Sequence, residues 1–315
     1  MSQLLTDLAL ILVAVGLLWK GADWVVHAAC RVACRFALPE AVIGATVVAL
    51  GTSAPEMVVT LVAALRGEPD ISVGNVVGSN IFNLGIILGA CAAFRAIPIS
   101  RQLVHRDTPA LLLASVLLLL FLADNTLGRW EGLSMVVILG GYLLYLVNRG
   151  GLFLEEHEEV DGERATTRDY FTLGLGLAAV LCGAHLLVTG SVSLARALGL
   201  SEWAIGVTVV AAGTSLPEMA TAVVAIHRGR TSLMAGTLVG SDLFNVLGVL
   251  GLAAFLHPLT IQASARWSLV MMAGMVAVLL LFLRSDFRLS RREGAALIVI
   301  AFLRWTRDLG PSIWQ

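Results

Sequence analysis

Charged residues are scarce in this chain. They make up 14% of its 315 residues, against roughly 25% in soluble domains, whereas hydrophobic residues make up 58%. Such a composition excludes an ordinary soluble domain. It indicates an all-α, polytopic membrane protein whose surroundings are a lipid bilayer.

Motifs for nucleic-acid binding, sulfur-based metal coordination and catalysis are also missing. The net charge of -1 argues against a nucleic-acid partner. The cysteines have neither a CxxC motif nor the spacing of a zinc site, and we interpret them as small buried side chains. They are Cys30, Cys34, Cys91 and Cys182. Without an HExxH motif or a nucleophile elbow, the chain is expected to be neither an enzyme nor a cofactor carrier.

Long apolar runs fill most of the sequence. The first, from Leu4 to Val15, has no basic segment before it and no small-residue cleavage site after it, so we expect a retained membrane helix. Runs of about 17 to 25 apolar residues predict membrane helices. Ten are predicted, at 4–30, 39–65, 71–94, 107–123, 130–148, 170–197, 202–227, 232–255, 266–283 and 293–309.

The chain is duplicated. At an offset of 162 residues, 23 of the 46 positions in 44–89 match their partners in 206–251. Five predicted helices per copy is an odd number, so the second copy must enter the membrane from the opposite side. We therefore predict two inverted repeats, 1–148 and 170–315, joined by a linker at 149–169.

Arginine is unevenly distributed between alternate connections. One set of connections holds 14 arginines and the opposite set holds 6. The positive-inside rule then places both termini outside and the linker in the cytoplasm. The linker's acidic run at 155–159 is either a solvated loop or a regulatory cation site.

Two copies of one motif place a carboxylate inside a membrane helix. The sequence GTSAPE occupies 51–56 and GTSLPE occupies 213–218, so Glu56 and Glu218 are equivalent. An ionisable group at membrane depth is costly and is a functional candidate by default. The duplication predicts a site with paired carboxylates.

A proline precedes each glutamate. Pro55 and Pro217 have no N–H to donate, so each helix should be interrupted and carbonyl groups near Thr52 and Thr214 should be freed. Free carbonyls in hydrocarbon need a partner. Carbonyl and carboxylate oxygens together suit calcium or sodium rather than zinc or copper.

Polar residues recur at helical spacing around both motifs. Ala49, Thr52, Ser53 and Glu56 share one helix face. The equivalent residues in the second copy are Ala211, Thr214, Ser215 and Glu218. The following helices add Ser79 with Asn83 and Ser241 with Asn245, each pair preceded by a GxxxG motif that permits close helix packing.

These segments resemble a known family. GATVVALGTSAPE with GNVVGSNIFN, and GVTVVAAGTSLPE with GTLVGSDLFN, look like the two repeats of the cation/calcium exchanger superfamily, above all its prokaryotic sodium/calcium exchangers. The resemblance implies ten helices in two inverted halves, outside termini and a prokaryotic cell (inner) membrane. It implies nothing about oligomeric state.

The resemblance also implies the ligands. Calcium would be held by the Glu56 and Glu218 carboxylates with the Thr52 and Thr214 carbonyls. Sodium would use an overlapping set: the two carboxylates, the Ala49 and Ala211 carbonyls, Ser53, Ser215, Ser79 and Ser241. Because the ions share oxygens, transport would be obligatory exchange.

The chain departs from the family at one position. Asn245 stands where some family members have Asp, and Asp242 replaces the Asn80 of the first copy. The counter-ion is therefore open. Asp23 and its counterpart His185 are interpreted as interfacial or packing groups rather than parts of an ion path.

Four functions remain. We predict a calcium/cation antiporter, with sodium as counter-ion. In the alternative, protons compete with calcium at the same glutamates. A passive cation channel and a membrane enzyme with an acid/base carboxylate pair are more remote; the enzyme would need two carboxylates in different environments, which duplication disfavours.

Overall fold

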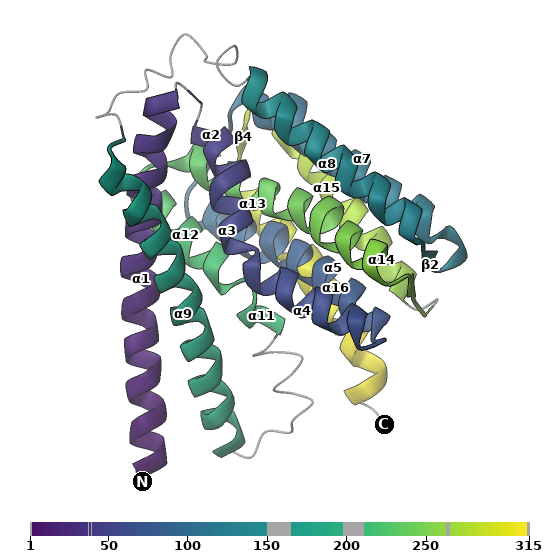
Figure 1. The fold of residues 1–315 in the computed structure, drawn as a ribbon, viewed down its shortest axis with the longest axis horizontal. Helices are drawn as coiled ribbons and strands as arrows, with labels where there is room; N and C mark the ends of the chain where they lie inside the picture. Colours follow the sequence, from purple (N-terminus) through teal and green to yellow (C-terminus); the bar gives the residue numbers. More distant parts are fainter. Residues whose placement is uncertain are drawn as a thin grey trace.

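The structure is a computed structural model that describes residues 2–36, 38, 40–149, 165–197, 211–262 and 265–313. Almost all of them are helical, and the helices pack side by side (Figure 1). Within these residues, six helices are long and apolar enough to cross a membrane, and a bent helix pair adds a seventh span. The predicted all-α, polytopic membrane architecture is confirmed.

The first half begins with a long helix and a bent one. The elements are α1 (Ser2–Phe36), α2 (Glu40–Ile43), the π-helix η1 (Gly44–Val48), α3 (Ala49–Thr52) and α4 (Ala54–Leu65). The segments before and after Ser53 differ in direction by 50°. The interruption predicted from Pro55 is therefore present, and the proline lies in the first turn of α4, where its missing N–H is tolerated.

The rest of the first half contains three long helical stretches, of which 69–94 and 103–124 are among the candidate membrane spans. Its elements are α5 (Pro69–Ile81), η2 (Phe82–Leu88), α6 (Gly89–Phe94), β1 (Ile97–Pro98), η3 (Leu103–Asp107), α7 (Thr108–Phe121), η4 (Leu122–Asp124), β2 (Thr126–Leu127) and α8 (Arg129–Arg149). The predicted helices at 71–94 and 130–148 match to within a few residues. The run at 107–123 begins earlier, because the π-helix η3 extends it.

The second half follows the same order. Its elements are α9 (Thr167–Ala197), α11 (Ala211–Gly213), α12 (Leu216–His227), α13 (Thr231–Leu243), η7 (Phe244–Leu250), α14 (Gly251–Leu256), β3 (Leu259–Thr260), α15 (Arg266–Asp286), β4 (Arg288–Leu289) and α16 (Arg291–Ile313). The acidic run at 155–159 and the start of the predicted helix 202–227 lie outside the described residues.

Helices α1 and α9 form a pair along one edge of the molecule (Figure 1). Glycines allow their backbones to touch: a methyl group on Gly21 would lie 2.9 Å from the Gly176 carbonyl oxygen, and one on Gly183 would lie 3.0 Å from that of Ala14. These two contacts are related by the 162-residue offset, since 14 and 176, and 21 and 183, are equivalent positions.

Polar contacts show that α1 and α9 run antiparallel. The Ser193 hydroxyl donates to Asp7 over 2.8 Å near one end of the pair, and Arg31 lies 3.2 Å from Asp169 near the other. The Arg35 guanidinium also donates to the Ala165 carbonyl. The pair is thus fastened at both ends and packed through glycine between them.

Two short strand pairs join the halves. β1 is antiparallel to β4, and β2 is antiparallel to β3. β3 precedes α15 and β4 follows it, so the pairs lie at opposite ends of this 21-residue helix, about 30 Å apart at 1.5 Å per residue. The separation matches the hydrocarbon thickness of a bilayer.

The glycine contact between α1 and α9 is testable with a matched control on one helix. Gly21→Ala forces a methyl group against the backbone of α9 and should lower stability by about 1–3 kcal/mol. Gly16→Ala, where nothing lies within 4 Å of the added methyl group, should leave stability unchanged or raise it, because alanine favours helix. Thermal unfolding in detergent measures both; equal midpoints would contradict this packing.

Candidate cation site

Two buried glutamates occupy equivalent places in the two halves. Glu56 lies in the first turn of α4 and Glu218 in the first turn of α12, and both side chains are fully buried. Each helix starts directly after a serine whose backbone is not helical, Ser53 or Ser215. The N-terminal end of each helix therefore helps to stabilise its own carboxylate.

The serines cross-link the halves. The Ser53 hydroxyl donates to Oε1 of Glu218 over 3.2 Å, and the Ser215 hydroxyl donates to Oε1 of Glu56 over 3.1 Å. Each bond maps onto the other at the 162-residue offset. Both carboxylates thus lie in one site, and each is held by the motif of the opposite half.

Several buried oxygen atoms of the predicted ligands have no hydrogen-bond partner among the described residues. They include Oε2 of Glu56, Oε2 of Glu218, Oγ of Ser79, Oδ1 of Asn83 and Oδ1 of Asn245. Buried polar atoms are normally paired, because an unpaired one costs about 1–3 kcal/mol. A concentration of unpaired oxygens with two carboxylates is a ligand set for a hard cation.

The other predicted ligands differ in the hydrogen bonds that they already make. The Thr52 hydroxyl donates to the Val48 carbonyl and lies 3.5 Å from the Ser241 hydroxyl, so Thr52 and Ser241 are in contact. The Ala49 carbonyl already accepts the Ser53 N–H at 3.0 Å. Any ion at Ala49 would therefore share this oxygen with a helix bond.

The second copy is less completely described. Thr214 lies in the turn between α11 and α12, the position equivalent to Thr52. Ala211 is the first residue of α11. The predicted ligand role of both stays a prediction.

Asparagines at the site come from π-helical segments. η2 and η7 both begin at a phenylalanine, and Asn83 and Asn245 directly follow it. A π-turn adds a residue to the turn and is frequent at functional sites. No local sequence signal predicts it; only its occurrence in both copies could have drawn attention to it.

A further asparagine was not predicted from the sequence. The Asn75 amide donates to the Glu56 carbonyl over 3.2 Å and to the Thr60 hydroxyl over 3.0 Å, so α5 supports the first turn of α4. The second copy has Thr237 at this position, which bonds within its own helix. Comparing the copies would have revealed the difference but not the contact.

The family of the chain follows from comparison with known proteins. The model of the sodium/calcium exchanger protein family matches residues 6–148 and 169–303. The chain belongs to the sodium/calcium exchanger protein family. The resemblance seen in the repeated motifs is therefore confirmed.

Relatives and solved structures of this family cover almost the whole chain. CaxA of Alkalimonas amylolytica, a proposed antiporter, is 39% identical over 303 residues, covering 92% of this chain and 94% of its own. The sodium/calcium exchanger MaX1 of Methanosarcina acetivorans is 29% identical, covering 93% and 96%. A solved structure of the sodium-calcium exchanger NCX_Mj superposes with a TM-score of 0.84 at 29% identity, covering 95% and 98%.

A pocket of about 430 Å³ adjoins the exchanger motifs. Its walls come from α4, α9 and α11 and the turn after α11, and it reaches Pro55 and Thr214. His185, on the exposed side of α9, also lines it. Asp23, the residue equivalent to His185, instead pairs with Arg228 and with Lys20.

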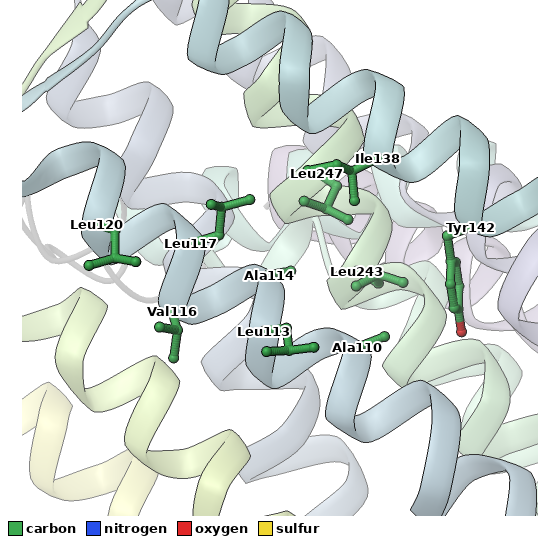
Figure 2. Close-up of a pocket in the computed structure, with 10 residues that line it drawn as sticks. All are labelled: Ala110, Leu113, Ala114, Val116, Leu117, Leu120, Ile138, Tyr142, Leu243 and Leu247. Atoms are coloured by element: carbon green, nitrogen blue, oxygen red, sulfur yellow. The ribbon is translucent and has the colours of Figure 1, made fainter.

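A second pocket, of about 390 Å³, has a different character. It lies between α7, α8 and the α13–η7 span, and Figure 2 shows aliphatic side chains around it, with Tyr142 at one edge. The Tyr142 hydroxyl is engaged with Asp107. With no charged residue in its lining, this pocket is unsuited to a cation.

The paired carboxylates should make the cation-free protein less stable. Glu56 and Glu218 repel each other in a buried site, so Glu56→Gln should raise the thermal midpoint in chelator and without sodium. The exposed Glu68, just after α4, serves as control, since Glu68→Gln should leave the midpoint unchanged. A lower midpoint for Glu56→Gln would contradict this account of the site.

Proposed function

We propose that this protein is a secondary active antiporter that exchanges calcium for sodium by alternating access at the site of Glu56 and Glu218. The observation that carries the proposal is the reciprocal bonding of each glutamate to the serine of the other half. It brings two negative charges into one buried site, and two charges balance one calcium ion. The related exchangers support the same activity.

Exchange follows if both ions need the same oxygens. Calcium would take the two carboxylates and the Thr52 and Thr214 carbonyls. Sodium ions would take the carboxylates with the serine hydroxyls and the Ala49 and Ala211 carbonyls. With an ion-free site disfavoured by its buried charges, the protein would change conformation only when occupied. Occupation by one ion type excludes the other, so fluxes are coupled.

The strand pairs support the proposed ten-helix topology. Strands that pair lie on the same side of the membrane, so the chain between β1 and β4 must cross an even number of times. Six predicted helices lie between them, including 202–227. If that helix did not cross, the number would be odd and β1 could not reach β4.

The same contacts support inversion of the repeats. β1 and β3 are equivalent at the 162-residue offset, yet they belong to strand pairs at opposite ends of α15. α1 and α9 are equivalent as well, yet they run antiparallel. The family model also matches in two stretches, one on each side of the linker.

We assign the moving part to α1 and α9. They form a pair at one edge, and neither carries a copy of the glutamate motif. The pocket beside Pro55 and Thr214 lies between α9 and the motif helices. Sliding of the pair would therefore open or close a route to the site.

Removal of one carboxylate should abolish exchange. Glu56→Gln or Glu218→Gln leaves calcium short of one charge in a buried site, which costs roughly 3–5 kcal/mol, a loss of more than about 100-fold. Calcium-45 uptake into proteoliposomes measures this loss, with Glu68→Gln as an active control. Normal uptake by either variant would refute the paired-carboxylate site.

The same proteoliposomes identify the counter-ion. A sodium gradient at fixed pH should drive calcium uptake, and a pH gradient without sodium should not. Uptake driven only by the pH gradient would show proton exchange at the same site. Calcium flux without any counter-ion would show a channel.

The proposed orientation has its own test. A phosphatase fused after residue 315 should be active outside the inner membrane, and a fluorescent protein there should be dark. A fluorescent protein inserted within 150–164 should be bright, because the linker is placed in the cytoplasm by its arginines. The opposite pattern would reverse the orientation.

A further inference from the structure

Four amide and carboxyl side chains form a buried layer behind the two glutamates. They are Asn80, Asn83, Asp242 and Asn245, all buried to 99% or more. Asn83 donates from Nδ2 to Oδ1 of Asp242 over 2.9 Å, and Asn245 donates from Nδ2 to Oδ1 of Asn80 over 3.2 Å. The two bonds are equivalent at the 162-residue offset, but one acceptor is a carboxylate and the other an amide.

The direction of every bond in this layer follows from Asp242. Its carboxylate accepts only, so Asn83 must present its NH₂ group to it, which turns Oδ1 of Asn83 the other way. Its backbone carbonyl also accepts only, and it receives Nδ2 of Asn80 at 3.0 Å. Asn80 must then offer Oδ1 to Asn245, which in turn leaves Oδ1 of Asn245 without a partner.

The outcome is two unpaired amide oxygens, one from each half. An asparagine that was free to rotate would offer an NH₂ group to the site half of the time, and an NH₂ group repels a cation. Oδ1 of Asn83 and Oδ1 of Asn245 are both buried and without a partner among the described residues. The layer thus uses both NH₂ groups and leaves both amide oxygens available as ligands.

We propose that Asp242 and Asn80 are positioning residues that orient the Asn83 and Asn245 amides so that their oxygens bind the transported cation. Asp242 acts on Asn83 through its side chain, and Asn80 acts on Asn245. Asp242 is close enough to Glu218 for the two carboxyl groups to interact electrostatically, but the only side-chain hydrogen bond shown for Asp242 in the described part of the chain comes from Asn83. The proposal rests on the proposed function and assigns a role to two residues behind its ligands.

Two substitutions of Asp242 distinguish the effect of its hydrogen-bond acceptor from the effect of its charge. Asp242→Leu removes the acceptor and frees Asn83 to rotate, which should raise the calcium concentration for half-maximal uptake roughly tenfold, as for other groups behind metal ligands. The maximal rate should change far less. Asp242→Asn restores an acceptor oxygen without the charge and should recover most of the loss.

Combined substitutions test the path of the effect. If Asp242 acts through Asn83, Asp242→Leu should add little to the loss already caused by Asn83→Leu. Asn80→Leu should likewise add little to Asn245→Leu. Asp242→Leu with Asn80→Leu should instead multiply the separate losses, because they act on different amides.

A control substitution tests whether any loss of a buried polar group weakens calcium uptake. Ser115→Ala removes another buried hydroxyl, one that bonds only to the Leu111 carbonyl within α7 in the described structure, and should leave half-maximal uptake unchanged. If Asp242→Leu does not fold, the Asn80 series alone decides. Equal losses for Asp242→Leu and Asp242→Asn would assign the effect to charge and overturn the proposal, as would an unchanged half-maximal concentration in Asp242→Leu and Asn80→Leu.

The proposed function can be refuted independently of the positioning role of Asp242 and Asn80. Absence of calcium uptake by the unaltered protein, or normal uptake by Glu56→Gln, would refute it whatever residue 242 does. If the unaltered protein transports and Glu56→Gln does not, the variants at Asp242 and Asn80 judge the positioning role alone.

Discussion

Two carboxylates buried next to each other are the constraint on which this structure depends. An isolated buried charge costs several kcal/mol, and two like charges add their repulsion. The protein limits that cost with serine hydroxyls and with the N-terminal ends of α4 and α12, while one oxygen of each carboxylate has no hydrogen-bond partner among the described residues. Those unpaired carboxylate oxygens are suited to a hard cation.

Duplication turns one motif into a complete site. Ser53 binds Glu218 and Ser215 binds Glu56, so the serine that bonds each glutamate comes from the opposite half. Close glycine contacts also join the two halves. Gly21 lies against the backbone of Gly176, and Gly132 lies against that of Gly251. Because every such contact joins the two halves, the arrangement of the two glutamates depends on how the halves pack.

The copies have diverged where symmetry is not needed. Asp242 replaces Asn80 and supplies a stronger acceptor for one amide than for the other. Asp23 forms an ion pair with Arg228, whereas its counterpart His185 lines a pocket beside the site. These differences give two similar half-sites unequal surroundings.

The sequence by itself determined that the chain is an all-α membrane protein, that its helices break before Glu56 and Glu218, and that it contains a sequence repeat. Apolar length, proline chemistry and self-similarity can each be read directly from the order of residues. It also indicated most of the site, since helical spacing places Ser53 beside Glu56. Only the tertiary structure decided that Ser53 donates its hydrogen bond to Glu218 instead. It also decided that Asn245 bonds to Asn80 and that Asn83 bonds to Asp242. Those partners are more than 150 residues apart and meet only because the two halves interlock. Such partners decide whether the oxygen or the NH₂ group of an amide is left free, and the amino-acid sequence alone does not reveal them.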